Sequence, residues 1–277
     1  MPRPKKRLGQ HFLFDPSILG RIADALDPAP DETVLEIGPG RGTLTAVLRP
    51  RVGRLVVLEK DRLLVPGLRE RFPDVTVVEG DALEADWHAL ARAGAKGTAE
   101  GAAGAGGFSV IGNIPYNITT PLIDKALVPP RPRRVVFLVQ LEVADRVAAG
   151  PGSPAYGALG VGVQAVARVE RLFTVPAGAF SPPPRVDSAV LRLSPLERPL
   201  VPDEFARSFR QLVVGVFGFR RKQLLRGIRE LTGWPADRAA AALAAAGLEG
   251  TTRPEQLPPE AFRRLHQALV DGGWRAG

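Results

Sequence analysis

The sequence predicts an α/β protein, a doubly wound and mostly parallel sheet followed by a smaller all-α domain. Near-continuous apolar runs alternate with helical patterns between about residues 15 and 150, as expected for parallel strands covered on both faces. Two further apolar runs, 161–170 and 186–193, have no helical pattern between them and are expected to close the sheet as an antiparallel pair. From about Pro199 only helical patterns remain. We therefore predict two domains, residues 1–197 and 198–277.

The five parallel strands are predicted from runs rich in β-branched and aliphatic residues. They cover residues 33–37, 54–59, 75–79, 108–112 and 134–140. The first helical pattern, 15–27, begins with Asp15 as the N-cap and Pro16 in the first turn. Its apolar face is formed by Ile18, Ile22 and Leu26. Further helices are predicted near 42–50, 61–71, 119–127 and 142–149.

The C-terminal domain is predicted from helical periodicity alone. Its first helix has an apolar face made of Phe205, Phe209, Leu212, Val213 and Val216. A basic helix over 220–229, an alanine-rich helix after Pro235 and a last helix near 259–271 follow. Earlier in the chain, the Gly- and Ala-rich segment 93–107 is interpreted as a flexible surface insertion with no chemical role.

Charge and composition favour a polyanionic partner. The formal net charge is +8 and the pI is near 10.5. Basic residues form two clusters along the chain. The first consists of Arg3, Lys5, Lys6 and Arg7. The second consists of Arg210, Arg220, Arg221, Lys222, Arg226 and Arg229. The chain has no cysteine and only 3 histidines, far apart in sequence, so no metal site is expected. No apolar run approaches the roughly 18 residues of a membrane span, and the start does not resemble a secretory signal, so we expect a cytoplasmic protein without a membrane partner.

A glycine-rich turn, Gly38-Pro39-Gly40-Arg41-Gly42, follows the first parallel strand. Such a turn lets the backbone approach a ligand closely, but it serves dinucleotides, phosphates and S-adenosylmethionine alike. Three acids narrow the choice. Glu36 lies inside the turn motif, where it would repel a pyrophosphate but not a cationic sulfonium or amino group. Glu59 ends the second strand and suits a ribose diol, and Asp81 follows the third strand and suits an adenine amine.

The fourth strand ends in Gly112-Asn113-Ile114-Pro115-Tyr116-Asn117. An adenine amine is a poor nucleophile because its lone pair is delocalised into the ring. The Asn113 side-chain oxygen and the Ile114 carbonyl are suited to accept the two amine hydrogens and to favour a tetrahedral nitrogen. Pro115 would fix the turn, and Tyr116 would stack on an extruded base. The motif therefore predicts methyl transfer to an adenine amine.

Specific motifs extend over almost the whole chain. They are Leu8-Gly9-Gln10-His11-Phe12-Leu13, Glu36-Ile37-Gly38-Pro39-Gly40, Glu59-Lys60-Asp61, Gly80-Asp81-Ala82, Asn113-Ile114-Pro115-Tyr116-Asn117-Ile118, Tyr156-Gly157, Phe180-Ser181-Pro182-Pro183-Pro184-Arg185-Val186-Asp187-Ser188 and Phe217 with Arg220-Arg221-Lys222. Taken together, they resemble the family of small-subunit ribosomal RNA adenine dimethyltransferases. The resemblance implies a class I methyltransferase fold, Rossmann-like, with a helical C-terminal domain.

The resemblance also implies an activity and a set of site residues. The family adds two methyl groups to each of two adjacent adenines near the 3′ end of 16S rRNA, in an assembling 30S subunit. The S-adenosylmethionine site would be lined by His11, Leu13, Gly38, Glu59, Asp81 and Asn113, and the region around Gln10 would close over it. Tyr116 and Phe180 would sandwich the target adenine. The rRNA phosphates would meet Arg220, Arg221, Lys222 and Arg226, and the protein is expected to be a monomer.

Three positions depart from the family pattern. His11 stands where Asn is frequent, Leu141 stands where Lys is usual, and Ile114 stands where the small-subunit enzymes more often have Leu. Macrolide-resistance methyltransferases of 23S rRNA often have Ile there, so such an enzyme is one alternative. A nucleic-acid-binding factor that keeps the fold without catalysis is another. A nicotinamide dehydrogenase would need a Gly-x-Gly-x-x-Gly turn, and the glycines from Gly38 to Gly42 are spaced differently.

Overall fold

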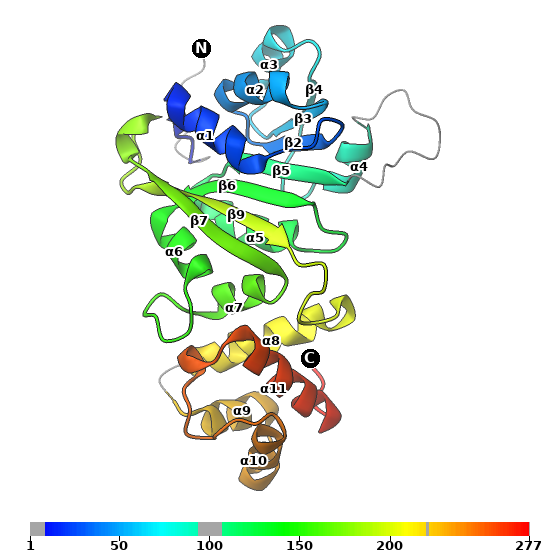
Figure 1. The fold of residues 1–277 in the computed structure, drawn as a ribbon, viewed down its shortest axis with the longest axis vertical. Helices are drawn as coiled ribbons and strands as arrows, with labels where there is room; N and C mark the ends of the chain where they lie inside the picture. Colours follow the sequence, from blue (N-terminus) through cyan, green and yellow to red (C-terminus); the bar gives the residue numbers. More distant parts are fainter. Residues whose placement is uncertain (1–8, 94–106, 220–221, 277) are drawn as a thin grey trace. The chain divides into compact units, whose positions relative to one another are not determined.

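The chain forms two compact units (Figure 1). The computed structural model describes residues 9–93, 107–219 and 222–276. We call the first unit the sheet unit, which holds the described residues up to Ala144 together with Glu170–Pro195. The helical unit holds Asp145–Val169 and the described residues from Leu196 onward. The stretch Asp145–Val169 thus groups with the helices, whereas the boundary predicted after residue 197 placed it in the first domain.

A seven-stranded sheet organises the sheet unit. Its strands are β2 (Thr33–Ile37), β3 (Arg54–Glu59), β4 (Thr76–Glu79), β5 (Phe108–Asn113), β6 (Arg134–Gln140), β7 (Ala167–Val175) and β9 (Ser188–Pro195). The spatial order is β4-β3-β2-β5-β6-β9-β7. The pairs from β4 to β6 are parallel, and β9 is antiparallel to β6. The predicted α/β class with a mostly parallel sheet is therefore confirmed.

The helices between the strands also match the predicted alternation. They are α1 (Pro16–Leu26), α2 (Thr43–Leu48), α3 (Val65–Arg71), α4 (Trp87–Ala93), α5 (Thr119–Ala126) and α6 (Leu141–Ala148). The Asp15 side chain accepts from the amides of Ser17 and Ile18, which confirms it as the N-cap of α1. Figure 1 shows α1 in front of the sheet and α5 behind it. Helix α4 was not predicted.

One segment was predicted with the wrong structure. The run 161–170 was expected to be a strand, but its first part belongs to helix α7 (Ala158–Gln164), and β7 begins only at Ala167. Tertiary contacts within the helical unit override the β propensity of the valines in this run. A Cβ on Gly160 would lie 2.7 Å from the Arg146 carbonyl, so the helix packs closely there. The Gln164 side chain donates to the carbonyls of Val147 and Ala149, 2.8 Å away in both cases.

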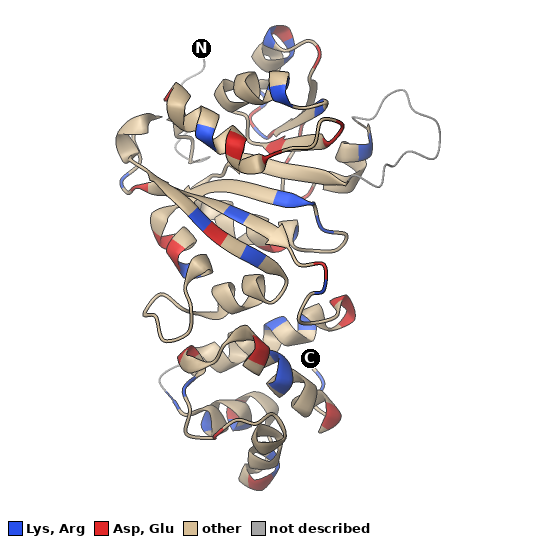
Figure 2. Ribbon diagram, viewed as in Figure 1, with Lys and Arg blue, Asp and Glu red and all other residues tan. Residues whose placement is uncertain are grey.

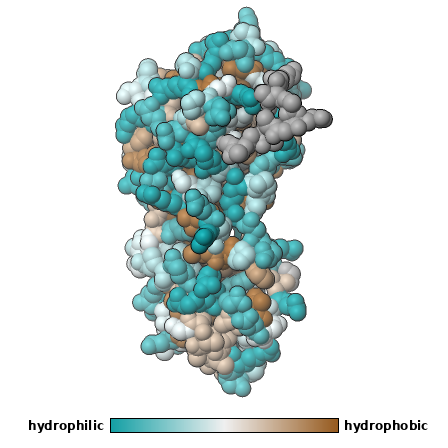
Figure 3. Space-filling model, turned by 45° about the vertical axis from the view of Figure 1, so that its right-hand side comes forward, coloured by the Kyte–Doolittle hydropathy of each residue, from teal (hydrophilic) through white to brown (hydrophobic). Residues whose placement is uncertain are grey.

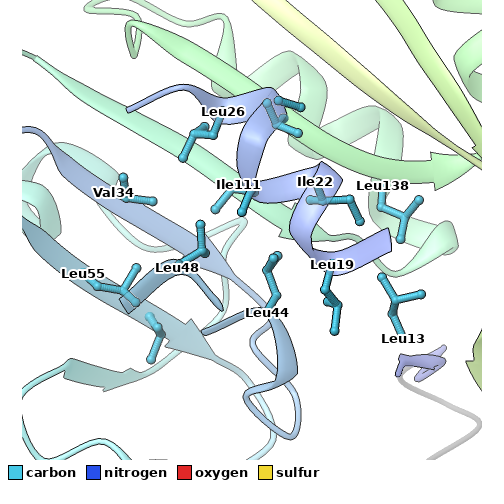
Figure 4. Packing of buried hydrophobic residues seen from close by; sticks show 14 of the residues in the cluster. Leu13, Leu19, Ile22, Leu26, Val34, Leu44, Leu48, Leu55, Ile111 and Leu138 are labelled. Carbon is cyan, nitrogen blue, oxygen red and sulfur yellow. The ribbon is translucent and has the colours of Figure 1, made fainter. Parts of the chain in front are cut away.

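The core beside α1 fixes the position of the strands that carry the site. Figure 4 shows Leu19, Ile22 and Leu26 of α1 facing side chains of α2 and of four strands. Those partners are Val34, Leu44, Leu48, Leu55, Ile111 and Leu138. Each Leu or Ile buried in this way contributes roughly 1.5–3 kcal/mol relative to leaving it exposed. The strand ends are thus held by a continuous apolar layer.

A small second sheet joins distant segments of the sheet unit. Strand β1 (Phe12–Leu13) pairs antiparallel with β8 (Phe180–Ser181), with Leu13 opposite Phe180. Two residues per strand are too few to give a sequence periodicity, so this sheet was not predicted. It brings the N-terminal motif beside the proline-rich loop at 182–184.

The helical unit has its own core. Its remaining helices are α8 (Ala206–Gly218), α9 (Leu224–Thr232), α10 (Ala236–Ala245) and α11 (Pro259–Asp271). Buried Tyr156 donates its hydroxyl to the Leu257 carbonyl at 2.8 Å inside this core. The basic helix predicted over 220–229 begins only at Leu224, because Gln223 is extended as its N-cap and Lys222 precedes it. Arg220, Arg221, the basic cluster Arg3–Arg7 and most of the predicted insertion 93–107 lie outside the described residues.

The face of the molecule drawn in Figure 3 is largely polar. Figure 2 shows both charge signs on strand β7, which forms one edge of the sheet. Charges on an edge strand disfavour pairing with another chain. Most residues visible in Figure 3 are hydrophilic, and a pale, weakly hydrophobic area lies in the helical unit. Among the described residues, no helix is both long and apolar enough to cross a membrane.

Candidate active site

A cavity opens at the carboxyl ends of the parallel strands in the sheet unit. Its walls come from the turns after β2, β3, β4 and β5 and from the N-terminal segment Gly9–Leu13. Ligands of doubly wound proteins bind at this edge of the sheet, where neighbouring loops diverge. The predicted residues that line the cavity are His11, Leu13, Gly38, Glu59, Asp81, Asn113, Ile114, Pro115 and Tyr116. The structure therefore brings together all the residues predicted for the cofactor site and, except for Phe180, those predicted for the target site.

The glycine turn after β2 adopts the backbone conformation that glycine favours. Gly38 and Gly40 have φ of +66° and +57°. A Cβ on Gly40 would also lie 2.9 Å from the Phe12 ring, so the N-terminal segment approaches the turn closely. The Gly40 amide donates to a Glu59 carboxylate oxygen at 2.9 Å. The turn is thus tied directly to the end of β3.

Glu59 is a buried carboxylate at the end of β3. It accepts from the amides of Gly40 and Asp61, at 2.9 and 2.7 Å. Burial raises the pKa of Glu59, although these two amide hydrogen bonds oppose the rise. Each carboxylate oxygen has a second lone pair that can still accept a hydrogen bond. The geometry is therefore compatible with hydrogen bonds from a ribose diol.

Glu36 lies deeper, with only 1% of its surface exposed. The Thr45 hydroxyl donates to its carboxyl group at 2.7 Å. Burial raises the pKa of Glu36 to about 8, and the negative charge of Glu59 adds to the rise. A cation in the cavity would oppose this shift by stabilising the ionised carboxylate. The chemistry of these carboxyl groups therefore fits a positively charged sulfonium ligand such as S-adenosylmethionine.

Asp81 follows β4 and is held in place from two directions. Its carboxylate pairs with Lys60 and accepts from the Leu83 amide at 3.0 Å. The hydrogen bond from Lys60 is the main cause of the lowered pKa of Asp81, so the side chain remains ionised. Lys60 lies in the Glu59-Lys60-Asp61 motif, but the sequence does not predict its ion pair with Asp81. An ionised carboxylate has more lone pairs than Lys60 and the Leu83 amide use, so Asp81 can also accept a hydrogen bond from an adenine amine.

Three hydrogen bonds hold the N-terminal segment over the cavity. The Gln10 amide donates to Asp61 at 3.1 Å, and the Thr43 hydroxyl donates to the Leu13 carbonyl at 2.9 Å. The Asn113 amide donates to the His11 carbonyl at 2.8 Å. This last bond fixes the orientation of the Asn113 side chain, whose carbonyl oxygen is then the group that can accept from a substrate amine.

Tyr116 lines the same cavity and begins a short 3₁₀ turn (Tyr116–Ile118). Its hydroxyl lies 2.7 Å from the hydroxyl oxygen of buried Ser188, and its ring is stacked on His11. Burial raises the pKa of Tyr116, so the phenol stays neutral. Ser188 belongs to the motif that ends in Asp187-Ser188, but the sequence does not show that Ser188 is buried against Tyr116.

Phe180 does not reach the cavity. It is only 2% exposed, packs into the core beside α1 and is not among the residues that line the site. The three prolines at 182–184 predict a loop here, with Phe180 near its tip. It instead begins strand β8 opposite Leu13, which explains its burial. The structure therefore brings Tyr116, but not Phe180, to the predicted base site, and the stacking role of Phe180 stays a prediction.

The predicted RNA contacts belong to the helical unit. Lys222 is exposed just before α9, and Arg226 is exposed on α9 with its guanidinium 3.8 Å from Glu230. Arg220 and Arg221 are outside the described part of the chain. Among the described residues, no group of three or more His, Cys, Asp or Glu side chains is placed to hold a metal ion.

The chain is similar to known proteins over nearly its whole length. Residues 1–270 match the family described as "Ribosomal RNA adenine dimethylase". The chain is similar to the ribosomal RNA small subunit methyltransferase A of Acidithiobacillus ferrooxidans, at 40% identity over 100% of this chain and 98% of that protein. It is 41% identical to the protein of the same name from Geobacter metallireducens, over 97% of this chain and 96% of that one.

Two solved structures share the fold over nearly the whole chain. The 23S rRNA methyltransferase ErmE has a TM-score of 0.70 and 30% identity, covering 94% of this chain and 99% of its own. A dimethyladenosine transferase from Plasmodium falciparum has a TM-score of 0.81 and 24% identity, covering 95% of this chain and 98% of its own. The second likeness shows the fold alone.

Proposed function

Because the chain belongs to the ribosomal RNA adenine dimethylase family, we propose that it dimethylates two adjacent adenines near the 3′ end of 16S rRNA. The methyl groups are placed on the N6 amines, and the substrate is an assembling 30S subunit. The family supports a methyltransferase that uses S-adenosylmethionine. The names of the relatives that are about 40% identical support the small subunit as the target.

One observation carries the proposal. The Asn113 side chain, oriented by the His11 carbonyl at 2.8 Å, lines the same cavity as the glycine turn and Glu59. A donor held at the turn and a base held at Tyr116 would therefore meet at the end of β5. S-adenosylmethionine, when bound, supplies a methyl group on a cationic sulfur.

The residues of the chain favour the transfer by orienting the amine. The Asn113 oxygen and the Ile114 carbonyl accept the two amine hydrogens, which directs the nitrogen lone pair out of the ring plane. These acceptors are fixed before the substrate arrives, so they stabilise positive charge that develops on the nitrogen. Tyr116 stacks on the extruded base. No strong base is required, since the nitrogen becomes acidic once it is methylated and can release its proton to water.

The cofactor is held by groups at successive strand ends. Gly38 and its turn, Leu13 and the backbone of His11 form the walls, Glu59 accepts from the ribose, and Asp81 accepts from the adenine amine. In this proposal Asn113, which lines the cavity, lies between the cofactor and the target amine. The helical unit supplies phosphate contacts through Arg220, Arg221, Lys222 and Arg226, and the domain 198–277 is thereby the RNA-binding part. We infer a monomeric, cytoplasmic protein that acts on the 30S particle.

The experiment that tests the target uses purified protein, labelled cofactor and two substrates. Undermethylated 30S particles should be labelled, and naked 23S rRNA should not. Label that appears only in 23S rRNA would contradict the proposal and favour an enzyme of the macrolide-resistance type. Binding of S-adenosylmethionine is measured in parallel. Absence of binding, with and without RNA, would favour a nucleic-acid-binding factor that has lost catalysis.

A further inference from the structure

We propose that the His11 side chain is a positioning residue that fixes the Tyr116 ring against the target base. The inference rests on the proposed function, because it concerns the base site of that reaction. The sequence expectation placed His11 only in the wall of the cofactor site. The contacts of its side chain are instead with Tyr116 and with the Pro182 carbonyl.

The first observation is how Tyr116 is held. Its ring centroid lies 5.7 Å from that of His11, with an interplanar angle of 25°, which is an offset stacked arrangement. Its hydroxyl lies 2.7 Å from the Ser188 hydroxyl oxygen, and Ser188 is buried at the start of β9. One face and the tip of the ring are thus fixed, and an extruded base can stack on the ring only where His11 does not cover it.

The second observation is that the imidazole is itself fixed. Its Nδ1–H donates to the Pro182 carbonyl at 2.8 Å. Pro182 follows β8, and β8 pairs with the strand that begins directly after His11. The histidine ring is therefore held between the proline-rich loop and the tyrosine. A ring fixed at both sides can transmit a defined orientation to Tyr116, whereas a freely rotating side chain cannot.

The third observation separates the role of the His11 side chain from that of its backbone. The contact of residue 11 with Asn113 uses the backbone carbonyl, at 2.8 Å. The backbone carbonyl is present whatever side chain the residue carries. A substitution at position 11 should therefore disturb Tyr116 while preserving the orientation of Asn113 and the walls of the cofactor site.

The two side-chain contacts of His11 can be tested separately. His11→Phe keeps an aromatic ring for the stack and loses the donor to Pro182. His11→Asn keeps a donor that can reach the Pro182 carbonyl and loses the ring. His11→Ala loses both. If the stack positions Tyr116, the kcat/KM for 30S particles should fall about tenfold in His11→Ala, fall nearly as much in His11→Asn and be largely retained in His11→Phe.

Dissociation constants for S-adenosylmethionine decide between positioning and simple cofactor contact. We expect them to stay within about twofold of the wild-type value in all three variants. Weakening of cofactor binding by as much as the loss of kcat/KM in His11→Ala would overturn the proposal. Thermal unfolding midpoints identify any variant that fails to fold. If His11→Ala fails to fold, the test is the comparison of His11→Phe, which keeps the stacked ring, with His11→Asn, which keeps the hydrogen-bond donor.

A double-mutant cycle with Tyr116→Ala asks whether His11 acts through the tyrosine. An RNA with 2-aminopurine at the target position reports stacking by quenching, and does not require turnover. In the wild-type background His11→Ala should reduce the quenching, and in the Tyr116→Ala background it should change it no further. Additive losses would contradict a role through Tyr116. Failure of the wild-type protein to methylate 30S particles would instead contradict the proposed function, so the two failures are distinguishable.

Discussion

The cofactor side and the target side of the cavity are built in different ways. On the cofactor side, hydrogen bonds join residues that are close in sequence, 9 positions apart for Glu36 and Thr45 and 19 for Gly40 and Glu59. On the target side, they join residues 102 positions apart for His11 and Asn113, and 171 for His11 and Pro182. The strand-to-helix turns of the first side are therefore built by local contacts, and only the N-terminal segment reaches them from farther away, with Gln10 and Asp61 51 positions apart. The second exists only once the whole sheet unit has folded.

This difference implies that the two sides can be damaged independently. Changes on the target side should reduce turnover and leave cofactor affinity intact, and changes on the cofactor side should do the opposite. The predictions below test that separation, beginning with the largest expected effect.

Asn113→Ala should give the largest loss. The variant removes an oriented acceptor that acts in the transition state, so kcat should fall by roughly 10²-fold or more. Cofactor affinity should fall far less than kcat, because the glycine turn and Glu59 keep their contacts. Single-turnover methylation of 30S particles and cofactor titration measure the two quantities. Near-normal turnover would refute the amine-orienting role of Asn113.

Glu59→Gln should act on the other side. Glutamine offers one acceptor oxygen where the carboxylate accepts from both Gly40 and Asp61, and its NH₂ group would face one of those amides. We expect the dissociation constant for S-adenosylmethionine to rise about tenfold, with a smaller change in kcat at saturating cofactor. Glu79→Gln, at the exposed end of β4, is the matched control. If Glu59→Gln changed kcat more than the affinity for S-adenosylmethionine, the two sides of the cavity would not act independently.

Stability of the cofactor-free protein should depend on pH through Glu36. The pKa of Glu36 in the folded protein is about 8, above its ordinary value of 4.5. The contribution of Glu36 to the free energy of unfolding is therefore fully present below pH 4.5. It is lost as the pH rises through 8, by at most about 1.4 kcal/mol per pH unit. Glu36→Gln should flatten this decline, and Glu79→Gln should not. Denaturant unfolding between pH 5 and 8.5 provides the measurement; parallel curves for wild type and Glu36→Gln would contradict the burial argument.

Charge reversal in the helical unit should have the smallest effect on the chemistry. Lys222→Glu combined with Arg226→Glu should weaken RNA binding and lower the slope of log affinity against log salt by up to about 2. The cofactor dissociation constant should not change. Arg207→Glu, exposed on α8, serves as the control. An unchanged salt slope would mean that these side chains only form a solvated face of the unit.

Sequence reasoning succeeded where the signal was local. The apolar runs predicted all five parallel strands to within one residue at each end, and the glycine turn with Glu36, Glu59 and Asp81 was placed at one edge of the sheet. It failed at 161–170, where valines favoured a strand but close packing within the helical unit imposes helix α7. A helix pattern also continued through Lys222, although the backbone is extended at Gln223.

The target side shows why the rest could not be predicted. Pairing of β1 with β8 involves two residues from each strand, too few for any periodic pattern, and it buries Phe180 rather than exposing it. The roles of Ser188 and of the His11 side chain depend on contacts between segments far apart in the chain. Such contacts follow from the folded sheet and not from any short motif.

The most direct test of the central claim is mass spectrometry of 16S rRNA from cells that lack this protein and are complemented with wild type or with Asn113→Ala. Wild type should restore N6-dimethyladenosine at two adjacent positions near the 3′ end, and Asn113→Ala should leave those adenines largely unmodified. Equal restoration by both proteins, or no change in 16S rRNA with wild type, would contradict a base site at the end of β5.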